Sequence, residues 1–106
     1  WEQIGMRLNQ LLANVEWQIA NQAGAPDAIA VQFHRELVWI HPFPNGNGRH
    51  ARLATDILIE QLGNKRFSWG ANADLVAQGN TRTRYIEALR AADQGNYQPL
   101  LHFARS

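Results

Sequence analysis

The sequence predicts a single all-α domain, and two observations support that prediction. Apolar residues recur at intervals of three and four positions through most of the 106-residue chain, which is the spacing of one face of an α-helix. Residues 1–40 contain no hairpin signal, such as Asn-Gly between alternating apolar residues. The chain has no internal repeat or linker, and its length allows one hydrophobic core. Residues 1–106 are therefore expected to form one domain.

Two helices are predicted before the middle of the chain. The first covers residues 1–22. The second begins at Pro26, whose fixed backbone angle suits the first helical turn, and Asp27 complements the positive end of the helix dipole. It ends near His41, because a residue that precedes a proline is pushed out of the α region. The apolar positions expected to face the core are Ile4, Leu8, Leu11, Leu12, Val15, Ile19, Ala30, Phe33, Leu37 and Ile40, with Ile29 and Trp39 beside them.

The second half of the chain is also predicted to be helical. A third helix starts near Asn47 or Gly48 and runs to Gly63. A short helix over 72–79, a longer one over 81–94 and a last short one close the core. The apolar positions expected to be buried are Leu53, Ala54, Ile57, Leu58, Leu62, Phe67, Trp69, Tyr85, Ile86, Leu89, Ala92, Leu100, Leu101 and Phe103.

Composition narrows the function classes. The chain has no cysteine, which excludes a disulfide scaffold and suits a reducing compartment such as the cytoplasm. No apolar run reaches the roughly 20 residues of a transmembrane helix, so no membrane partner is expected. Nine acidic residues nearly balance the nine arginines and one lysine, so the net charge is only +1. Nucleic-acid-binding surfaces usually have a larger basic excess. Nucleic-acid binding therefore remains only a third hypothesis.

The segment HPFPNGNGRHAR, from His41 to Arg52, concentrates the chemically useful residues between the second and third helices. Gly46 and Gly48 can adopt backbone angles closed to other residues, and successive N–H groups in such a turn bind anions. The positive end of the third helix faces the same space. Arg49 and Arg52 are three residues apart, so they share a face of that helix. The segment therefore predicts a phosphate-binding turn.

The same segment also supplies a base. Neutral His41 can take a proton from a hydroxyl near physiological pH. Arg49 can clamp phosphate oxygens with two hydrogen bonds and stabilise developing charge. Asp56, four residues after Arg52, is a candidate carboxylate partner for that arginine. Together these residues suggest transfer of a phosphorus-containing group to a hydroxyl.

His34 lies seven residues before His41, about two helical turns, so both side chains can point the same way. A shared metal is one interpretation. Zinc-binding histidine pairs on helices are usually three or four residues apart, and no third ligand is evident. His34 is therefore expected to be a packing or hydrogen-bonding residue.

HPFPNGNGRHAR resembles the signature HxFx(D/E)GNGRxxR of Fic-domain proteins and matches every fixed position but one. The surrounding WIHPFPNGNGRHARL, with the later FSWG, RYIEALRAAD and PLLHFARS, resembles the Fic subfamily called mobile mystery protein B. The resemblance implies a bacterial protein with the all-α Fic fold, a helical bundle with the signature loop between two central helices. It also implies transfer of AMP from ATP to a Ser, Thr or Tyr hydroxyl of a target protein.

The resemblance also implies a role for each matching residue. His41 would be the general base, Phe43 the anchor of the loop, Gly46, Asn47 and Gly48 the phosphate cradle, Arg49 the clamp on the outer phosphates, and Arg52 the second arginine near the γ-phosphate. Doc-type relatives, which transfer phosphate itself, carry lysine at the position of Gly48, so the glycine speaks against that branch.

Asn45 is the departure from the signature, because active members carry Asp or Glu there to bind Mg²⁺. A neutral amide oxygen brings one negative charge fewer to a hard cation. The expectation is weakened or altered nucleotide chemistry. The second hypothesis is therefore a catalytically weak or inactive Fic-like module that binds nucleotide or a partner.

Further partners are implied by the family. The target protein is unknown, and an inhibitory partner or segment is expected in many Fic proteins. Family members carry a flap before the signature that docks target peptides, and residues 1–40 show no such hairpin. The chain also begins at Trp1 inside an apolar pattern. It is therefore expected to be part of a longer protein whose N-terminal region holds the flap and any inhibitory element.

Overall fold

A computed structural model describes the backbone of residues 2–40, 47–71 and 78–106 and the side chains of 3–40, 49–71 and 81–106. These residues form five α-helices and no strand, which confirms the all-α prediction. The helices are α1 (Glu2–Ala20), α2 (Pro26–Ile40), α3 (Asn47–Gln61), α4 (Gln78–Asp93) and α5 (Gln98–Arg105). None of these helices is long and apolar enough to cross a membrane.

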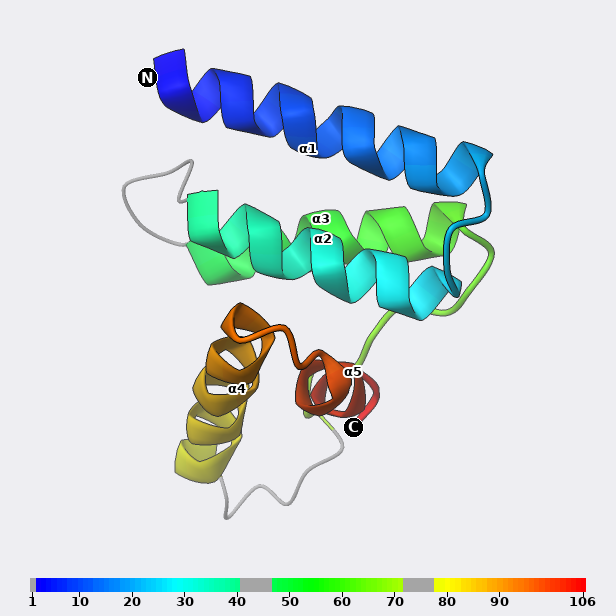
Figure 1. Ribbon diagram of the computed structural model, residues 1–106. Coiled ribbons are helices and arrows are strands. Elements are labelled where there is room, and N and C mark those ends of the chain that lie inside the picture. The colour runs from blue at the N-terminus through cyan, green and yellow to red at the C-terminus, as the bar shows by residue number, and fades with distance from the viewer. Residues whose placement is uncertain (1, 41–46, 72–77) are drawn as a thin grey trace.

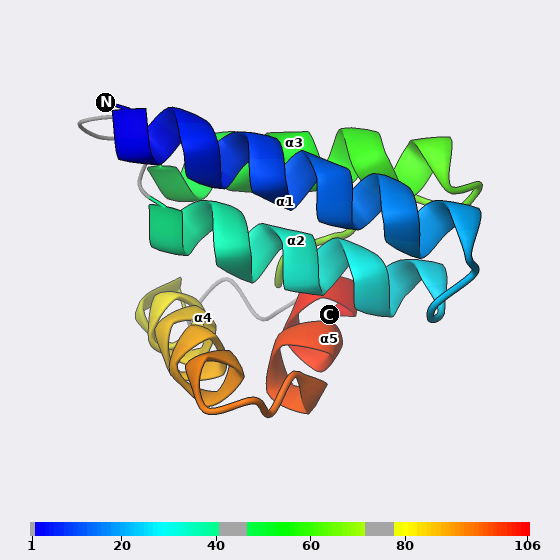
Figure 2. The same ribbon diagram turned by 45° about the horizontal axis from the view of Figure 1, so that its top comes forward.

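The helices are arranged in three layers, with α2 at the centre (Figure 1). α1 lies on one side of the α2–α3 pair, and α4 and α5 lie on the other, as the tilted view also shows (Figure 2). α2 contacts each of the other four helices, and α4 also packs against α5. The segment that follows α2 therefore starts from the most enclosed helix of the fold.

The hydrophobic core consists of two clusters on either side of α2. The smaller cluster joins α1 to α2 through Leu11, Val15, Phe33 and Ile40. The larger one lies among α2, α3, α4, α5 and the connector after α3, and its buried members are Ala30, Val31, Ile59, Phe67, Ala88, Ala92, Leu100, Phe103 and Ala104. Leu58 of α3 packs against both clusters, so the two form a continuous interior.

The ends of the central helices confirm the sequence analysis. α2 begins at Pro26 and ends at Ile40, one residue before the predicted limit at His41. α3 begins at Asn47, as the sequence predicts. The predicted longer helix corresponds to α4, which starts three residues earlier than expected, and the last short helix corresponds to α5. Most of the predicted short helix at 72–79 lies outside the described residues.

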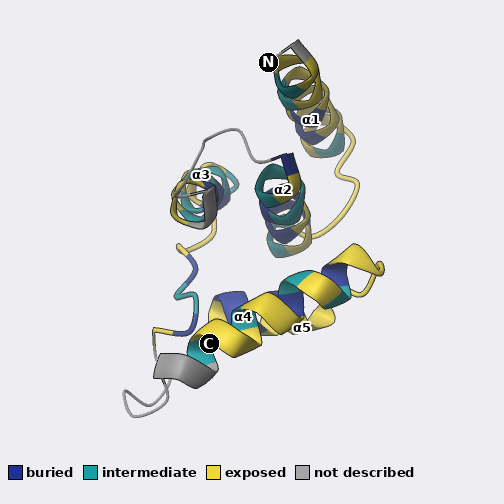
Figure 3. Ribbon diagram, turned by 90° about the vertical axis from the view of Figure 1, so that its left-hand side faces the viewer, coloured by how far each residue is buried: buried dark blue, intermediate teal, exposed yellow. Residues whose placement is uncertain are grey.

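Several positions predicted to face the core are exposed instead. Leu12 and Ile19 of α1, Leu53 and Ile57 of α3, and Ile86 of α4 all have a third or more of their surface exposed. Figure 3 shows how little of α1 is buried, because its helix contacts are with α2 alone. In α3 the fully buried line is Ala51, Thr55 and Ile59, and in α4 Ala88 and Ala92 are buried. Leu53, Ile57 and Ile86 each lie two positions from a residue of these buried lines, so the helix turns them to the opposite, exposed side.

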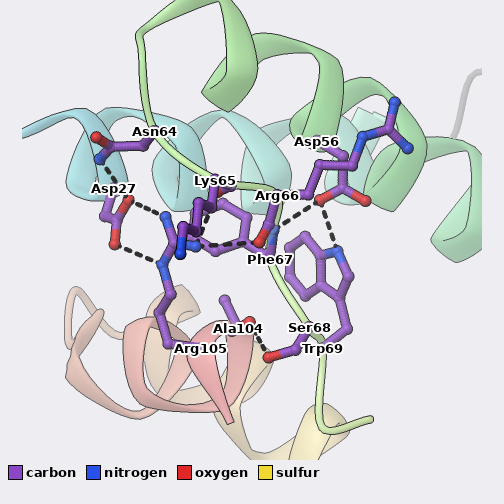
Figure 4. Close-up of polar contacts among 10 residues, drawn as sticks. All are labelled: Asp27, Asp56, Asn64, Lys65, Arg66, Phe67, Ser68, Trp69, Ala104 and Arg105. Atoms are coloured by element: carbon purple, nitrogen blue, oxygen red, sulfur yellow. Dashed lines mark hydrogen bonds and ion pairs between the residues drawn. The ribbon is translucent and has the colours of Figure 1, made fainter.

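The C-terminal helix is fastened to the start of α2. Arg105 donates two hydrogen bonds to the Asp27 carboxylate, Nη2 to Oδ1 at 2.6 Å and Nε to Oδ2 at 2.8 Å (Figure 4). The Arg105 guanidinium also lies 4.3 Å from the centre of the Phe67 ring. The hydrogen bonding with Arg105, supported by Asn64, holds the pKa of Asp27 below its usual value against the opposing effect of burial. Asp27 therefore joins α5 to α2, besides its predicted position at the helix N-terminus.

Candidate functional site

Most of the predicted site lies in the segment between α2 and α3. His41, Phe43, Asn45 and Gly46 fall outside the described residues, so their roles stay predictions. The last residue of α2 and the first of α3 lie at the same end of the molecule, on the left in Figure 1. Asn47 and Gly48 begin the first turn of α3, the end of a helix whose N–H groups have no intrahelical partner and where the helix dipole is positive.

Arg49 and Arg52 follow within the first two turns of α3. Arg49 is exposed, so its guanidinium is accessible to a ligand. Arg52 is half-buried, and its guanidinium carbon lies 5.3 Å from the centre of the Tyr85 ring on α4. The two arginines therefore occupy different surroundings: the first extends into solvent, and the second rests on an aromatic ring.

Asp56 does not have the partner that the sequence suggested. Its Oδ1 accepts hydrogen bonds from the indole Nε1 of Trp69 at 3.0 Å and from the backbone N–H of Phe67 at 3.3 Å (Figure 4). The prediction that Asp56 serves Arg52 is therefore wrong. The physical reason is that a half-buried indole and a backbone N–H of the connector both need an acceptor, and Asp56 satisfies both.

A buried hydrogen-bond network links α2, α3 and α4 next to Arg52. His34 has no exposed surface, and its two ring nitrogens contact Thr55 Oγ1 at 3.2 Å and the Tyr85 hydroxyl at 2.7 Å. The prediction that His34 is a packing or hydrogen-bonding residue is confirmed. The described residues contain no group of three His, Cys, Asp or Glu that could hold a metal ion.

The partners of His34 define its tautomer. Thr55 donates its hydroxyl proton to the carbonyl of Ala51 at 2.6 Å, so its oxygen accepts from Nδ1–H of His34. The unprotonated Nε2 then accepts the hydrogen bond from the Tyr85 hydroxyl. Burial lowers the pKa of His34 to about 4, so the ring is neutral near pH 7 with its proton on Nδ1. No buried side-chain nitrogen or oxygen among the described residues lacks a partner.

Burial controls the titration of this network. Desolvation lowers the pKa of His34 to about 4, the positive charge of Arg52 acts in the same direction, and a hydrogen bond with the Ala51 backbone opposes both. Burial raises the pKa of the Tyr85 phenol, while the charge and hydrogen bonding of Arg52 lower it. The Trp69 ring, 4.6 Å from the His34 ring between centres, completes the enclosure.

Sequence analysis missed Thr55 and assigned Tyr85 only to the core. Their sequence distances from His34, 21 and 51 residues, place them beyond any local motif. One signal was present: a tyrosine on the apolar face of a helix needs a partner for its hydroxyl, and a histidine on the apolar face of another helix is a candidate.

A groove of about 600 Å³ lies between α1 and α2. Its walls include Trp17 and Trp39, and the Arg7 guanidinium lies 5.0 Å from the centre of the Trp39 ring. Ile40, which lines one end, is the residue immediately before His41. The groove therefore borders the start of the signature segment, and none of the described candidate nucleotide-binding residues lines it.

The fold and the site together define a helical domain built around a glycine- and arginine-rich turn that leads into α3. The sequence model of the Fic/DOC family matches residues 1–59, which include α1, α2, the signature segment and most of α3. The chain belongs to this family. The narrower resemblance to mobile mystery protein B stays a prediction.

The chain is similar to several proteins named as protein adenylyltransferases. It is 32% identical to one from Aedes aegypti over 78 residues, which are 74% of this chain and 14% of that protein. It is 31% identical to one from Caenorhabditis briggsae over 98 residues, which are 91% of this chain and 18% of that protein. It is 32% identical to one from Nematostella vectensis over 78 residues, which are 74% of this chain and 16% of that protein. The chain therefore spans less than a fifth of these relatives. No solved structure shows significant similarity to it.

Proposed function

We propose that the protein transfers AMP from ATP to a Ser, Thr or Tyr hydroxyl of a target protein. The observation that carries the proposal is the position of the signature arginines: Arg49 is exposed and Arg52 half-buried in the first two turns of α3, directly after the glycine-rich turn. Membership of the Fic/DOC family and similarity to proteins named as adenylyltransferases support the same reaction.

In the proposed reaction the target hydroxyl loses its proton to His41, and its oxygen attacks the α-phosphorus of ATP. The bond to the bridging oxygen breaks, and pyrophosphate leaves. Gly46 to Gly48 and the N-terminus of α3 hold the phosphates through backbone N–H groups. Arg49 stabilises the charge that develops on the departing phosphates, and Arg52 contacts the γ-phosphate. The chain thus contributes a base, a cradle and two cations.

Asn45 would help to hold a magnesium ion bound with ATP, whose charge would offset that of the phosphate oxygens. Mg²⁺ commonly keeps substrate phosphates and waters as most of its ligands and takes one or two from the protein. One amide oxygen from Asn45 fits that arrangement, with less charge than a carboxylate would supply. We propose Asn45 as the magnesium position. We also propose that the protein acts in the cytoplasm, because a chain without cysteine suits a reducing compartment.

The test uses the full-length protein and ATP labelled either at the α- or at the γ-phosphate. Label from the α-position is expected to appear on protein, and label from the γ-position is not. Protein labelled from the γ-phosphate would mean phosphate transfer and would overturn the proposal. Binding of ATP without transfer of either label would instead establish the second candidate, a nucleotide-binding module without turnover.

Asn45 is the observation that favours this second candidate, and it gives a further prediction. Asn45→Asp restores one negative charge at the proposed magnesium position, so the rate of α-label transfer is expected to rise about tenfold. Asn45→Ala, the matched control, removes the ligand oxygen and is expected to lower the rate. Equal rates for wild type and Asn45→Asp at limiting Mg²⁺ would show that Asn45 does not limit the reaction.

A further inference from the structure

The hydrogen-bonded pair of His34 and Tyr85 lies next to Arg52. The Tyr85 hydroxyl donates to Nε2 of His34 at 2.7 Å, and the Tyr85 ring carries the Arg52 guanidinium at 5.3 Å. The pair crosses from α2 to α4, whereas Arg52 belongs to α3. Three helices therefore meet at a single arginine of the signature.

The network also reaches the backbone next to that arginine. Thr55 accepts from the other ring nitrogen of His34 and donates to the carbonyl of Ala51, the residue immediately before Arg52. His34 has no exposed surface, and Thr55 and Ala51 are buried, so the positions of these groups are fixed by close packing. The network therefore holds both the main chain before Arg52 and the ring under its guanidinium.

We propose that Tyr85, held by its hydrogen bond to His34, is the residue that positions the Arg52 side chain for the γ-phosphate of ATP. This inference rests on the proposed function. A free arginine samples many rotamers, and ordering it on binding costs affinity. A ring anchored from behind restricts Arg52 before the nucleotide arrives. Tyr85 thus acts through Arg52 and has no contact with substrate of its own.

The hydroxyl group distinguishes this role from simple packing. A phenylalanine would fill nearly the same volume, and it would lose the bonds of the hydroxyl to His34 and to Arg52. Tyr97, the chain's other tyrosine, is also half-buried and packs against the larger core cluster, so it offers the same chemical change at another place. Its hydroxyl has no assigned role in the site.

The test compares the affinities for ATP and for ADP, which lacks the γ-phosphate, by calorimetry on the full-length protein. Tyr85→Phe removes the bonds of the hydroxyl to His34 and Arg52 and is expected to weaken ATP binding by about fivefold or more, while ADP binding stays unchanged. Arg52→Ala is expected to remove the preference for ATP entirely. Tyr97→Phe is expected to change neither affinity.

The outcomes separate this inference from the proposed function. If Arg52→Ala abolishes the preference for ATP but Tyr85→Phe keeps it, the inference is overturned and the proposed function stands. If Arg52→Ala has no effect, the assignment of Arg52 to the γ-phosphate fails.

A second measurement, on the ligand-free protein, tests whether Tyr85 positions Arg52. The NMR signal of the Arg52 Nε–H should be sharp and shifted by the Tyr85 ring in wild type, and it should be averaged by motion in Tyr85→Phe. An unchanged signal would contradict the inference.

A second variant guards against a general loss of structure. In His34→Gln the amide can still accept the bond from Tyr85, so much of the preference for ATP is expected to return relative to His34→Leu, which cannot accept it. Equal preferences in the two His34 variants would mean that the hydrogen bond plays no part in positioning Arg52.

Discussion

Replacing His41 by alanine is expected to lower the rate of AMP transfer about a hundredfold to ten-thousandfold, the usual contribution of a general base. The residue follows directly after Ile40, the last residue of the helix that contacts all the others, and precedes the first turn of α3 by six positions. Without its imidazole the attacking hydroxyl has no nearby proton acceptor. The rate is measured from initial velocities of α-label transfer at saturating ATP.

Two comparisons make this prediction specific. His102→Ala removes an exposed histidine from α5, away from the signature segment, and is expected to leave the rate unchanged. The affinity of His41→Ala for ATP should also stay close to that of wild type, because the phosphates are held by the cradle and the arginines. A His41→Ala rate similar to that of wild type would rule out His41 as the base.

Acidification is expected to destabilise the fold through His34, by about 3 kcal/mol between pH 6.5 and pH 4. Burial lowers the pKa of His34 to about 4 in the folded state, whereas the unfolded chain has the ordinary value of 6.5. Between these values the unfolded state binds the proton and the folded state does not. The stabilisation is therefore complete above pH 6.5, falls progressively to about pH 4 and changes no further below that. Urea unfolding at a series of pH values measures it.

The control variant is His34→Gln, which has no titrating group at this position. Its free energy of unfolding should lose most of the pH dependence between 6.5 and 4. Asp27 does not confuse the result: its pKa is lowered from 3.8, so its contribution is present above that value and is lost only at lower pH. Parallel curves for wild type and His34→Gln would show that His34 is not the titrating group.

Helix ends were predictable from the sequence because they depend on local chemistry. Pro26 fixes its own backbone angle and Pro42 restricts that of the residue before it, and the described bounds of α2 agree with both. The burial of single side chains was less predictable. Periodicity locates the apolar face of a helix, but the width of the covered face depends on its neighbours. Leu53 and Ile86 are exposed for this reason.

The candidate site likewise has one part that could be predicted from the sequence and one part that could not. The segment from His41 to Arg52 is continuous in sequence, so its phosphate-binding chemistry could be proposed from residue types and spacing alone. The link from His34 to Tyr85 joins residues 51 positions apart and required the packing of α2 against α4. For Asp56 the spacing was misleading. The four-residue interval suggested Arg52 as its partner, whereas in the structure its carboxylate accepts a hydrogen bond from the indole of Trp69.

The attachment of α1 has a consequence for how the molecule opens. Since α1 makes its helix contacts with α2 alone, its detachment would disturb the small cluster around Leu11 and Phe33 and leave the larger cluster intact. The smaller cluster is therefore the part of the described core that we expect to open first. Trp69 and Tyr85, which surround His34, pack against the larger cluster, so we expect the network around His34 to persist when α1 detaches.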